Sequence, residues 1–159
     1  LGDVYKRQVK VEDFLKQANV AFKKVRHGEA FTAQEVAARA HVPGDRLAKV
    51  VVVRAGEDYA LAVCSATRVI DLDMLSKVIG EKVRLANEGE MEEILSDTEL
   101  GAEAPFGSLY GLPTYVDESL SHNDSIVFQA GTHEDTIEAS FADYRRAAKP
   151  MMADFTRHV

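Results

Sequence analysis

The amino-acid sequence predicts a single α/β domain of the mixed α+β type, with a mixed β-sheet flanked by helices. Its 159 residues are 46% hydrophobic, which is enough chain for one domain with its own core. Strand and helix patterns follow one another without strict alternation, which argues against a doubly wound parallel sheet. An unbroken run of valines, residues 50–53, is typical of a strand that is buried on both faces.

The N-terminal third begins with an amphipathic helix, expected over residues 9–18. Its apolar residues Val11, Phe14, Leu15 and Ala18 have the i, i+3, i+4, i+7 spacing of one helix face. Two further elements are expected before residue 43: a strand over residues 20–25, and a helix over residues 32–40 that opens with a capping box from Thr32 to Glu35.

A β-hairpin and a capped helix are predicted in the middle of the chain. The valine run extends to a strand over residues 47–55, and Gly56 opens a turn that leads to a returning strand over residues 59–64. A helix is expected over residues 71–79, because Gly80 follows it at the position where a left-handed C-terminal glycine is common. A short strand over residues 83–86 and a short acidic helix over residues 90–95 complete this part.

The segment of residues 97–112 is rich in glycine and proline and shows no regular period. Irregular segments of this length are uncommon inside a compact domain and tend to be functional. Regular structure then resumes, with strands expected over residues 114–116, 126–129 and 135–140 and a last helix over residues 141–148 that Pro150 ends.

The domain is assigned to residues 9–150. Residues 1–8 show no periodicity, and we interpret them as a non-native leader. Residues 151–159 are assigned to a C-terminal tail.

The net charge of −7 hides an uneven distribution. Residues 1–54 carry eleven Lys and Arg against six Asp and Glu, whereas residues 85–144 carry fourteen acids and no Lys or Arg. Residues 145–159 carry four bases and one acid. Phosphate binding depends on local basic surface, so an acidic total does not exclude a nucleic-acid partner. A solvated surface of mixed sign remains the alternative.

Several classes of protein are excluded by composition. No apolar run approaches the roughly 20 residues that span a bilayer, so no membrane partner is expected. Cys64 is the single cysteine and forms no internal disulfide, which favours a cytoplasmic location. The five histidines lack metal-ligand spacing, so no metal and no other cofactor is predicted.

Lys49 is the first candidate for chemistry, because it is the one cation at the mouth of an apolar strand. A lysine there can neutralise a phosphate or an oxyanion, or act as a base. The alternative is an edge residue whose stem covers apolar surface while its amine reaches water.

Gly101, Pro105 and Gly107 mark a second candidate. Glycines allow backbone N–H groups to approach a ligand closely, and proline stiffens the loop that presents them. Such a loop suits recognition of a carbonyl, carboxylate or phosphate, although the same pattern is also that of an ordinary turn.

His133 is the third candidate, because it follows a predicted strand and Gly131. It can orient an amine or water or act as an acid or base near neutral pH, and an exposed loop histidine is the alternative. Cys64 lies in an apolar strand without a local activating cation, which favours a small core residue over a nucleophile.

These features in this order resemble the YbaK/ProX family of aminoacyl-tRNA deacylases, which includes the editing (insertion) domain of bacterial prolyl-tRNA synthetase. The resemblance covers roughly residues 9–150. It rests on the motifs Leu-Ala-Lys49-Val-Val-Val, Gly101-x-x-x-Pro105-Phe106-Gly107, Gly111-Leu112-Pro113 with Asp117, Ala130-Gly131-Thr-His133, and His27 with Thr32.

The resemblance implies hydrolysis of the ester that joins a wrong amino acid to the 3′ adenosine of tRNA. It implies that Lys49 holds the terminal phosphate or positions the ester, that the backbone from Gly101 to Pro105 binds near the carbonyl, and that His133 places the α-amino group. Positioned water or groups of the substrate would replace a protein nucleophile. The residues expected to bind substrate are His27, Phe31, Thr32, Cys64, Phe106, Gly107, Leu112 and Asp117.

A freestanding editor needs its own basic surface, or a partner synthetase, to hold tRNA. The cations expected to contact tRNA are Lys23, Lys24, Arg26, Arg46 and Arg54. Alanine or cysteine on proline tRNA is the family's usual substrate. Two alternatives stay open: a non-catalytic module of the same fold that binds tRNA, a nucleotide or a synthetase, and an unrelated hydrolase that uses Cys64.

Overall fold

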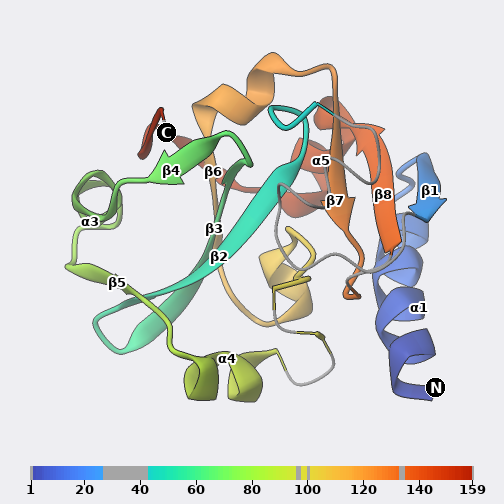
Figure 1. Ribbon diagram of the computed structural model, residues 1–159, viewed down its shortest axis with the longest axis horizontal. Helices are drawn as coiled ribbons and strands as arrows, with labels where there is room; N and C mark the ends of the chain where they lie inside the picture. Colours follow the sequence, from blue (N-terminus) through green and yellow to red (C-terminus); the bar gives the residue numbers. More distant parts are fainter. Residues whose placement is uncertain (1, 27–42, 96–97, 100, 133–134, 159) are drawn as a thin grey trace.

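The fold is known from a computed structural model, which describes residues 2–26, 43–95, 98–99, 101–132 and 135–158 (Figure 1). The side chains of residues 2–9, 25 and 26 lie outside that description. Four helices are described: α1 (Gly2–Gln17), α3 (Leu72–Ile79), α4 (Glu88–Ile94) and α5 (Phe141–Ala148). None of the helices in the described part of the chain is long and apolar enough to cross a membrane.

The central sheet has five strands in the order β5-β2-β3-β6-β9. Strand β2 runs antiparallel to β3 and β5, whereas β6 runs parallel to both β3 and β9, so the sheet is mixed as the sequence predicts. Its members are β2 (Ala48–Ala55), β3 (Asp58–Ser65), β5 (Val83–Leu85), β6 (Thr114–Asp117) and β9 (Met151–Ala153).

A second, antiparallel sheet packs beside one face of the central sheet. It has the order β1-β8-β7, with β1 (Phe22–Arg26), β8 (Asp135–Ser140) and β7 (Ser125–Gln129). A single bridge from Leu47 to Val127 connects it to the start of β2. The main core fills the space between these sheets, α1 and α5, and includes Ala48, Val63 and Val116 from the central sheet.

The opposite face of the central sheet is covered by α3 and by a two-stranded sheet of β4 (Arg68–Ile70) and β10 (Thr156–His158). Figure 1 shows α3 and β4 on the far side of β2 and β3 from α1 and β8. Val53 and Ala62 face this side, and Val52 and Leu61 face away from it. The valine run is therefore enclosed on both sides, although Val50 and Val51 stay half-buried.

Local sequence signals explain the predicted elements that the structure confirms. Asp71 caps α3, because its carboxylate accepts from the backbone N–H groups of Asp73 and Met74, and Gly80 ends it with φ +89°. Asn87 and Glu90 form a capping box at the start of α4. Helix α5 and strand β8 have the predicted bounds.

Three parts of the fold differ from the sequence analysis. Helix α1 begins at Gly2 rather than near residue 9, so it includes the segment that was interpreted as a leader. The expected tail contains β9 and β10, and β4 was not predicted. The helix expected over residues 32–40 lies outside the described residues.

Candidate active site

Lys49, Cys64 and Asp117 form a row across three neighbouring strands, which we call the polar row. Lys49 on β2 pairs directly with Cys64 on β3, and the parallel ladder of β3 with β6 brings Asp117 next to Cys64. Their side chains share the face of Val53 and Ala62, because side chains in a strand alternate between the two faces.

The thiol of Cys64 is fully buried. Burial raises its pKa to about 11, and the charge of Asp117 acts in the same direction, whereas Lys49 and Arg68 lower it. The thiol is therefore neutral near pH 7, and a neutral thiol is a poor nucleophile. Lys49, on the neighbouring strand, is a cation that could activate the thiol, but the effect of burial on the pKa of Cys64 is larger than that of Lys49.

The ammonium group of Lys49 donates to the backbone carbonyl oxygen of Arg68 at 2.6 Å. This contact uses one of its three N–H donors, and the side chain is half-buried. Lys49 therefore lies between the buried thiol and the small β4–β10 sheet, with donors left for a second partner.

Asp117 is nearly fully buried, and hydrogen bonds satisfy its carboxylate. One oxygen accepts from Phe155 N–H at 2.9 Å, and the other accepts from Thr156 Oγ1 at 2.9 Å and from Ser119. Burial alone would raise the pKa of Asp117, but these hydrogen bonds outweigh it and lower the pKa below its ordinary value. Asp117 therefore anchors the C-terminal segment.

Residues 101–107 and residues 130–132 lie against each other, and we call them the paired loops. Glu99 N–H donates to the Gly131 carbonyl and Gly131 N–H donates to the Ala102 carbonyl, both at 3.0 Å. Gly101 and Gly131 have φ of +88° and +94°, a region that favours glycine. The structure thus brings two of the sequence-predicted segments together.

Five of the six backbone N–H groups of residues 101–107 already donate to protein oxygens. Glu103, a buried carboxylate, accepts from Gly101 N–H at 2.6 Å, and the Tyr110 hydroxyl accepts from Ala104 N–H at 3.0 Å. The N–H groups of Ala102, Phe106 and Gly107 likewise donate to protein oxygens. In this conformation these N–H groups hold the loop together rather than point at a ligand.

Aromatic side chains of the core pack against the paired loops. Phe106 is fully buried, with its ring centroid 5.0 Å from that of Phe14 and 5.2 Å from that of Tyr144. The Tyr144 hydroxyl donates to the Pro105 carbonyl oxygen at 2.8 Å. Phe106 therefore belongs to the core rather than to an open pocket.

Position 107 requires glycine, because other parts of the chain approach its Cα closely. A Cβ at this position would lie 2.2 Å from the Leu112 carbonyl oxygen and 2.5 Å from Thr114 Oγ1. Leu112 itself is half-buried and packs with Val52 and Leu61.

The polar row and the paired loops lie on opposite faces of the central sheet. Ala104 and Phe106 pack with Ala48 and Val63, which face away from Lys49. The structure therefore does not bring the Lys49 side chain to the loop of Gly101 and Pro105. His27, Phe31, Thr32 and His133 lie outside the described residues.

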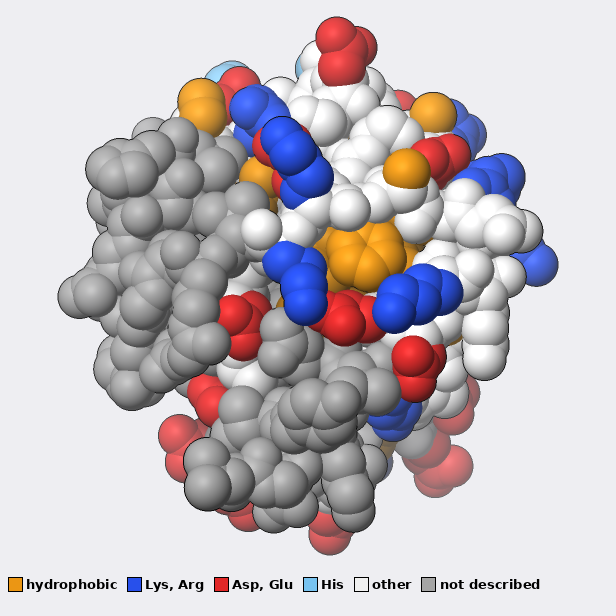
Figure 2. All heavy atoms as spheres, turned by 90° about the vertical axis from the view of Figure 1, so that its right-hand side faces the viewer, with side chains coloured by type: hydrophobic (Ala, Val, Ile, Leu, Met, Phe, Trp, Pro, Cys, Tyr) orange, Lys and Arg blue, Asp and Glu red, His pale blue; other side chains and the backbone are white. Residues whose placement is uncertain are grey.

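Most cations expected to contact tRNA are paired with acids. Lys24 lies 3.1 Å from Glu12, Arg46 lies 2.7 Å from Glu138, and Arg54 lies 2.9 Å from Glu90. Figure 2 shows this mixed pattern on the side of α1, β1 and β8, where basic and acidic side chains lie close together around an apolar patch. Lys23 is exposed and has no such pair among the described residues, and the Arg26 side chain lies outside the description.

Sequence reasoning missed several residues that shape the site: Arg68, Glu103, Tyr110, Tyr144 and Thr156. One relation could have been found. The turn at Gly56 fixes the hairpin register, so Lys49 must lie opposite Cys64. No group of three or more His, Cys, Asp or Glu able to hold a metal occurs within the part that the structure describes.

The chain belongs to the aminoacyl-tRNA editing domain family, which matches residues 27–147. It is 33% identical over 101 residues to the multifunctional Ser/Thr-tRNA deacylase ProXp-y of Escherichia coli K12, and the match covers 62% of this chain and 60% of the relative. The same identity and coverage hold for the protein of that name from E. coli O157:H7.

Solved structures share the fold over nearly the whole chain. A candidate trans-editing enzyme for prolyl tRNA synthetase has a TM-score of 0.83 at 20% identity, covering 95% of this chain and 97% of that one. The hypothetical protein APE2540 has a TM-score of 0.85 at 20% identity, covering 93% and 99%. These likenesses establish the mixed α+β fold.

Proposed function

We propose that this chain is an aminoacyl-tRNA deacylase, which hydrolyses the ester of a mischarged tRNA. The observation that carries the proposal is the family match, because residues 27–147 include both the polar row and the paired loops. Water adds to the ester carbonyl, the bond to the ribose oxygen breaks, and that oxygen takes a proton as the amino acid leaves. The neutral, buried Cys64 thiol supports attack by water rather than by this side chain.

The paired loops are proposed to form a rigid wall beside the amino-acid pocket. Their internal hydrogen bonds and their contact with Tyr144 support a role in fixing shape. A rigid wall favours editing, since a pocket discriminates small side chains only when its size is fixed. We propose that His133, which directly follows Thr132, places the substrate's α-amino group.

Lys49 is proposed to contact a phosphate near the 3′ end of the tRNA rather than the ester itself, because it lies on the opposite face of the central sheet from the paired loops. It can do so with the two N–H groups that Arg68 leaves unused, or by exchanging the Arg68 carbonyl for a phosphate oxygen. Alanine or cysteine on proline tRNA is the proposed substrate, with tRNA and a synthetase as cytoplasmic partners. The related E. coli proteins are named for Ser and Thr, so these two amino acids belong in the same test.

The test is a deacylation panel of Ala-, Cys-, Ser- and Thr-tRNA with the native chain, Lys49→Ala and Lys77→Ala. Lys77 is an exposed lysine on α3 and serves as the charge-matched control. We expect hydrolysis of at least one ester, a loss of at least about tenfold (about 1.4 kcal/mol) in Lys49→Ala, and no change in Lys77→Ala. Hydrolysis of none would refute the function, whereas an unchanged Lys49→Ala would remove only Lys49 from the mechanism.

A non-catalytic binding module is the second candidate. It is favoured by the loop of Gly101 and Pro105, where five of the six backbone N–H groups donate to protein oxygens rather than point at an oxyanion. This alternative predicts tRNA binding without release of any amino acid, so the same panel run beside a binding titration separates the two.

A further inference from the structure

A hollow between the C-terminal ends of α1 and α5 has the chemistry of a nucleotide site. Its volume is about 490 Å³, and its floor is apolar, with the half-buried Phe14 ring beside two alanines. Amide and cationic side chains form the rim. The lining residues are Phe14, Gln17, Ala18, Asn19, Arg146, Ala147 and Lys149, and none of them is acidic.

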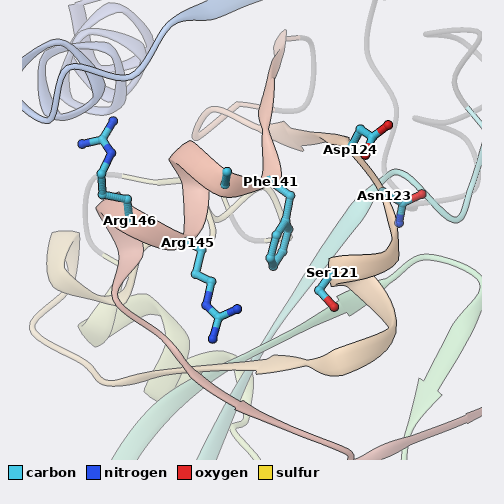
Figure 3. A pocket seen from close by; sticks show the side chains of 7 residues that line it. Ser121, Asn123, Asp124, Phe141, Arg145 and Arg146 are labelled. Carbon is cyan, nitrogen blue, oxygen red and sulfur yellow. The ribbon is translucent and has the colours of Figure 1, made fainter.

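Three other hollows on the described surface have acids at or beside their cations, whereas in this one Asp143 pairs with Arg146 and Lys149 has no acid partner among the described residues. The hollow between the 3₁₀ turn η2 (Glu118–His122) and α5 has Asp124 at its rim. Figure 3 shows Arg145 and Phe141 extending from α5 toward this hollow; Arg146 also lines it, although its guanidinium points away from these two side chains. The hollow beside Lys23 is lined by Glu138 and Asp143. In the hollow beside Arg54 and Arg84, both arginines form ion pairs with Glu90.

Arg146 prepares the α1–α5 hollow for an anion. The C-terminal end of a helix carries partial negative charge on its last carbonyl groups, and this charge would repel a phosphate. Arg146 donates to the Ala18 carbonyl at 2.7 Å and to the Asn19 carbonyl at 3.1 Å, so it covers the end of α1. Asp143 pairs with one edge of its guanidinium at 3.3 Å.

The remaining polar side chains of the hollow are unused. Lys149, Gln17 and Asn19 have no side-chain hydrogen bond or ion pair among the described residues. Lys149 follows the last turn of α5 and is exposed. One cation, two amides and a half-buried aromatic ring are thus available to a ligand at one place.

We propose that this hollow binds one nucleotide unit of the tRNA, an inference that rests on the proposed function. Lys149 would hold the phosphate, while Arg146 covers the carbonyl groups at the end of α1. The base would lie on the Phe14 ring, with the Gln17 and Asn19 amides at its edge, which is how proteins recognise unpaired RNA bases.

The hollow is directly connected to the paired loops. Phe14 forms its floor and also contacts Phe106, with 5.0 Å between the ring centroids. Helix α5 contributes Tyr144 to the core, where its hydroxyl donates to the Pro105 carbonyl oxygen, and Lys149 directly follows the same helix on the surface. A nucleotide in the hollow would therefore sit against the same structure that shapes the proposed amino-acid pocket.

Binding of uncharged tRNA(Pro) is the direct test, with Lys149→Gln compared against Lys77→Gln. Both lysines are exposed, Lys77 in the last turn of α3 and Lys149 directly after α5, so the charge change is matched. Loss of one phosphate contact implies about fivefold weaker binding at 100 mM salt and a slope of log K against log[salt] that is shallower by about 0.7. Gln17→Glu, which adds an acid at an exposed position, is expected to weaken binding as well.

Equal binding by Lys149→Gln and Lys77→Gln would overturn the proposal. Cytidine and adenosine 5′-monophosphate provide the second arm. Shifts of the Gln17 and Asn19 side-chain amide resonances with tRNA and with a monophosphate indicate a general nucleotide site, and shifts with tRNA alone indicate a site that needs the polymer. Unshifted amides with either ligand would also overturn it. If the native chain deacylates tRNA and Lys149→Gln binds tRNA normally, only the nucleotide site is refuted. If tRNA binding depends on Lys149 and the native chain deacylates nothing, only the deacylase proposal is refuted.

Discussion

The polar row and the paired loops solve the problem of holding functional groups in different ways. In the polar row, charged and titratable side chains are buried against one another, and each depends on a partner: Lys49 on the Arg68 carbonyl, Asp117 on the Phe155 amide and Thr156. In the paired loops, backbone groups bond to one another over an aromatic floor.

This difference predicts which changes each region tolerates. The polar row should respond to pH and to loss of charge, because its hydrogen bonds involve ions. The paired loops should respond to changes of shape, because their donors are satisfied internally and their packing is tight. The predictions below test that division, from the largest effect to the smallest.

Gly107→Ala should be the most damaging single change in the paired loops. The added Cβ would meet the Leu112 carbonyl at 2.2 Å, and backbone at that distance must move. We expect a loss of about 3 kcal/mol in the free energy of unfolding, measured by urea denaturation. Gly111→Ala is the control, because its φ is +71° but nothing lies within 4 Å; strain alone should cost it about 1 kcal/mol. Equal losses would show that the close approach at Gly107 is not what fixes the loop.

Asp117→Asn should destabilise the polar row in a pH-dependent way. Loss of the charged acceptor for Phe155 and Thr156 should cost about 2 kcal/mol of unfolding free energy at pH 7. The pKa of Asp117 is lowered from 3.8 in the folded state, so its contribution is present above that pH and is lost as pH falls through the lower folded value. The difference between native and variant should therefore shrink below pH 3.8.

Asp124→Asn is the matched control for this measurement, since Asp124 is exposed. It should change stability by less than about 0.5 kcal/mol at any pH. A difference for Asp117→Asn that stays constant down to acid would contradict the ionic account of the polar row.

The two regions were predictable from sequence to different extents. Strands β2 and β3 follow from the valine run and Gly56, and helix α3 follows from Asp71 and Gly80, because these are local signals. The pairing of Lys49 with Cys64 is fixed by the same turn. Gly101 and Gly131 were also singled out from the sequence, and both have positive φ in the structure; their role at a site stays a prediction.

The separation of the two regions onto opposite faces could not be predicted. Residues 101–106 form no helix or strand, and such a loop carries no period that relates its face to that of Lys49. The short strands β4, β9 and β10 were missed for a related reason, because three residues form a strand only when a distant partner is present. That Lys149 has no acid partner among the described residues could not be predicted either, because it depends on which acids the fold brings near it.

Tyr144→Phe should show how far the paired loops depend on one buried hydrogen bond. The change keeps the ring against Phe106 and leaves the Pro105 carbonyl without its donor, at a cost of about 1 kcal/mol in unfolding free energy. If the loops form the pocket wall, kcat/KM for deacylation should fall by up to about tenfold. Tyr115→Phe, on the other face of the sheet and without a hydroxyl partner in the described part, should change neither. A loss of stability with unchanged selectivity between Ala- and Ser-tRNA would limit Tyr144 to a structural role.

Cys64→Ala should have the smallest effect, and it tests whether the polar row contains a nucleophile. Removing the buried sulfur should cost about 0.8 kcal/mol in unfolding free energy and leave deacylation unchanged, because the thiol is neutral at working pH. With a pKa of about 11, only about one thiol in a thousand is ionised at pH 8, and burial hides that fraction from reagents. Thiol labelling of the native chain should therefore follow unfolding, becoming fast only in urea. Rapid labelling at pH 8 together with loss of hydrolysis in Cys64→Ala would restore the hydrolase that uses Cys64, and would make Lys49 its activating cation rather than a contact for tRNA.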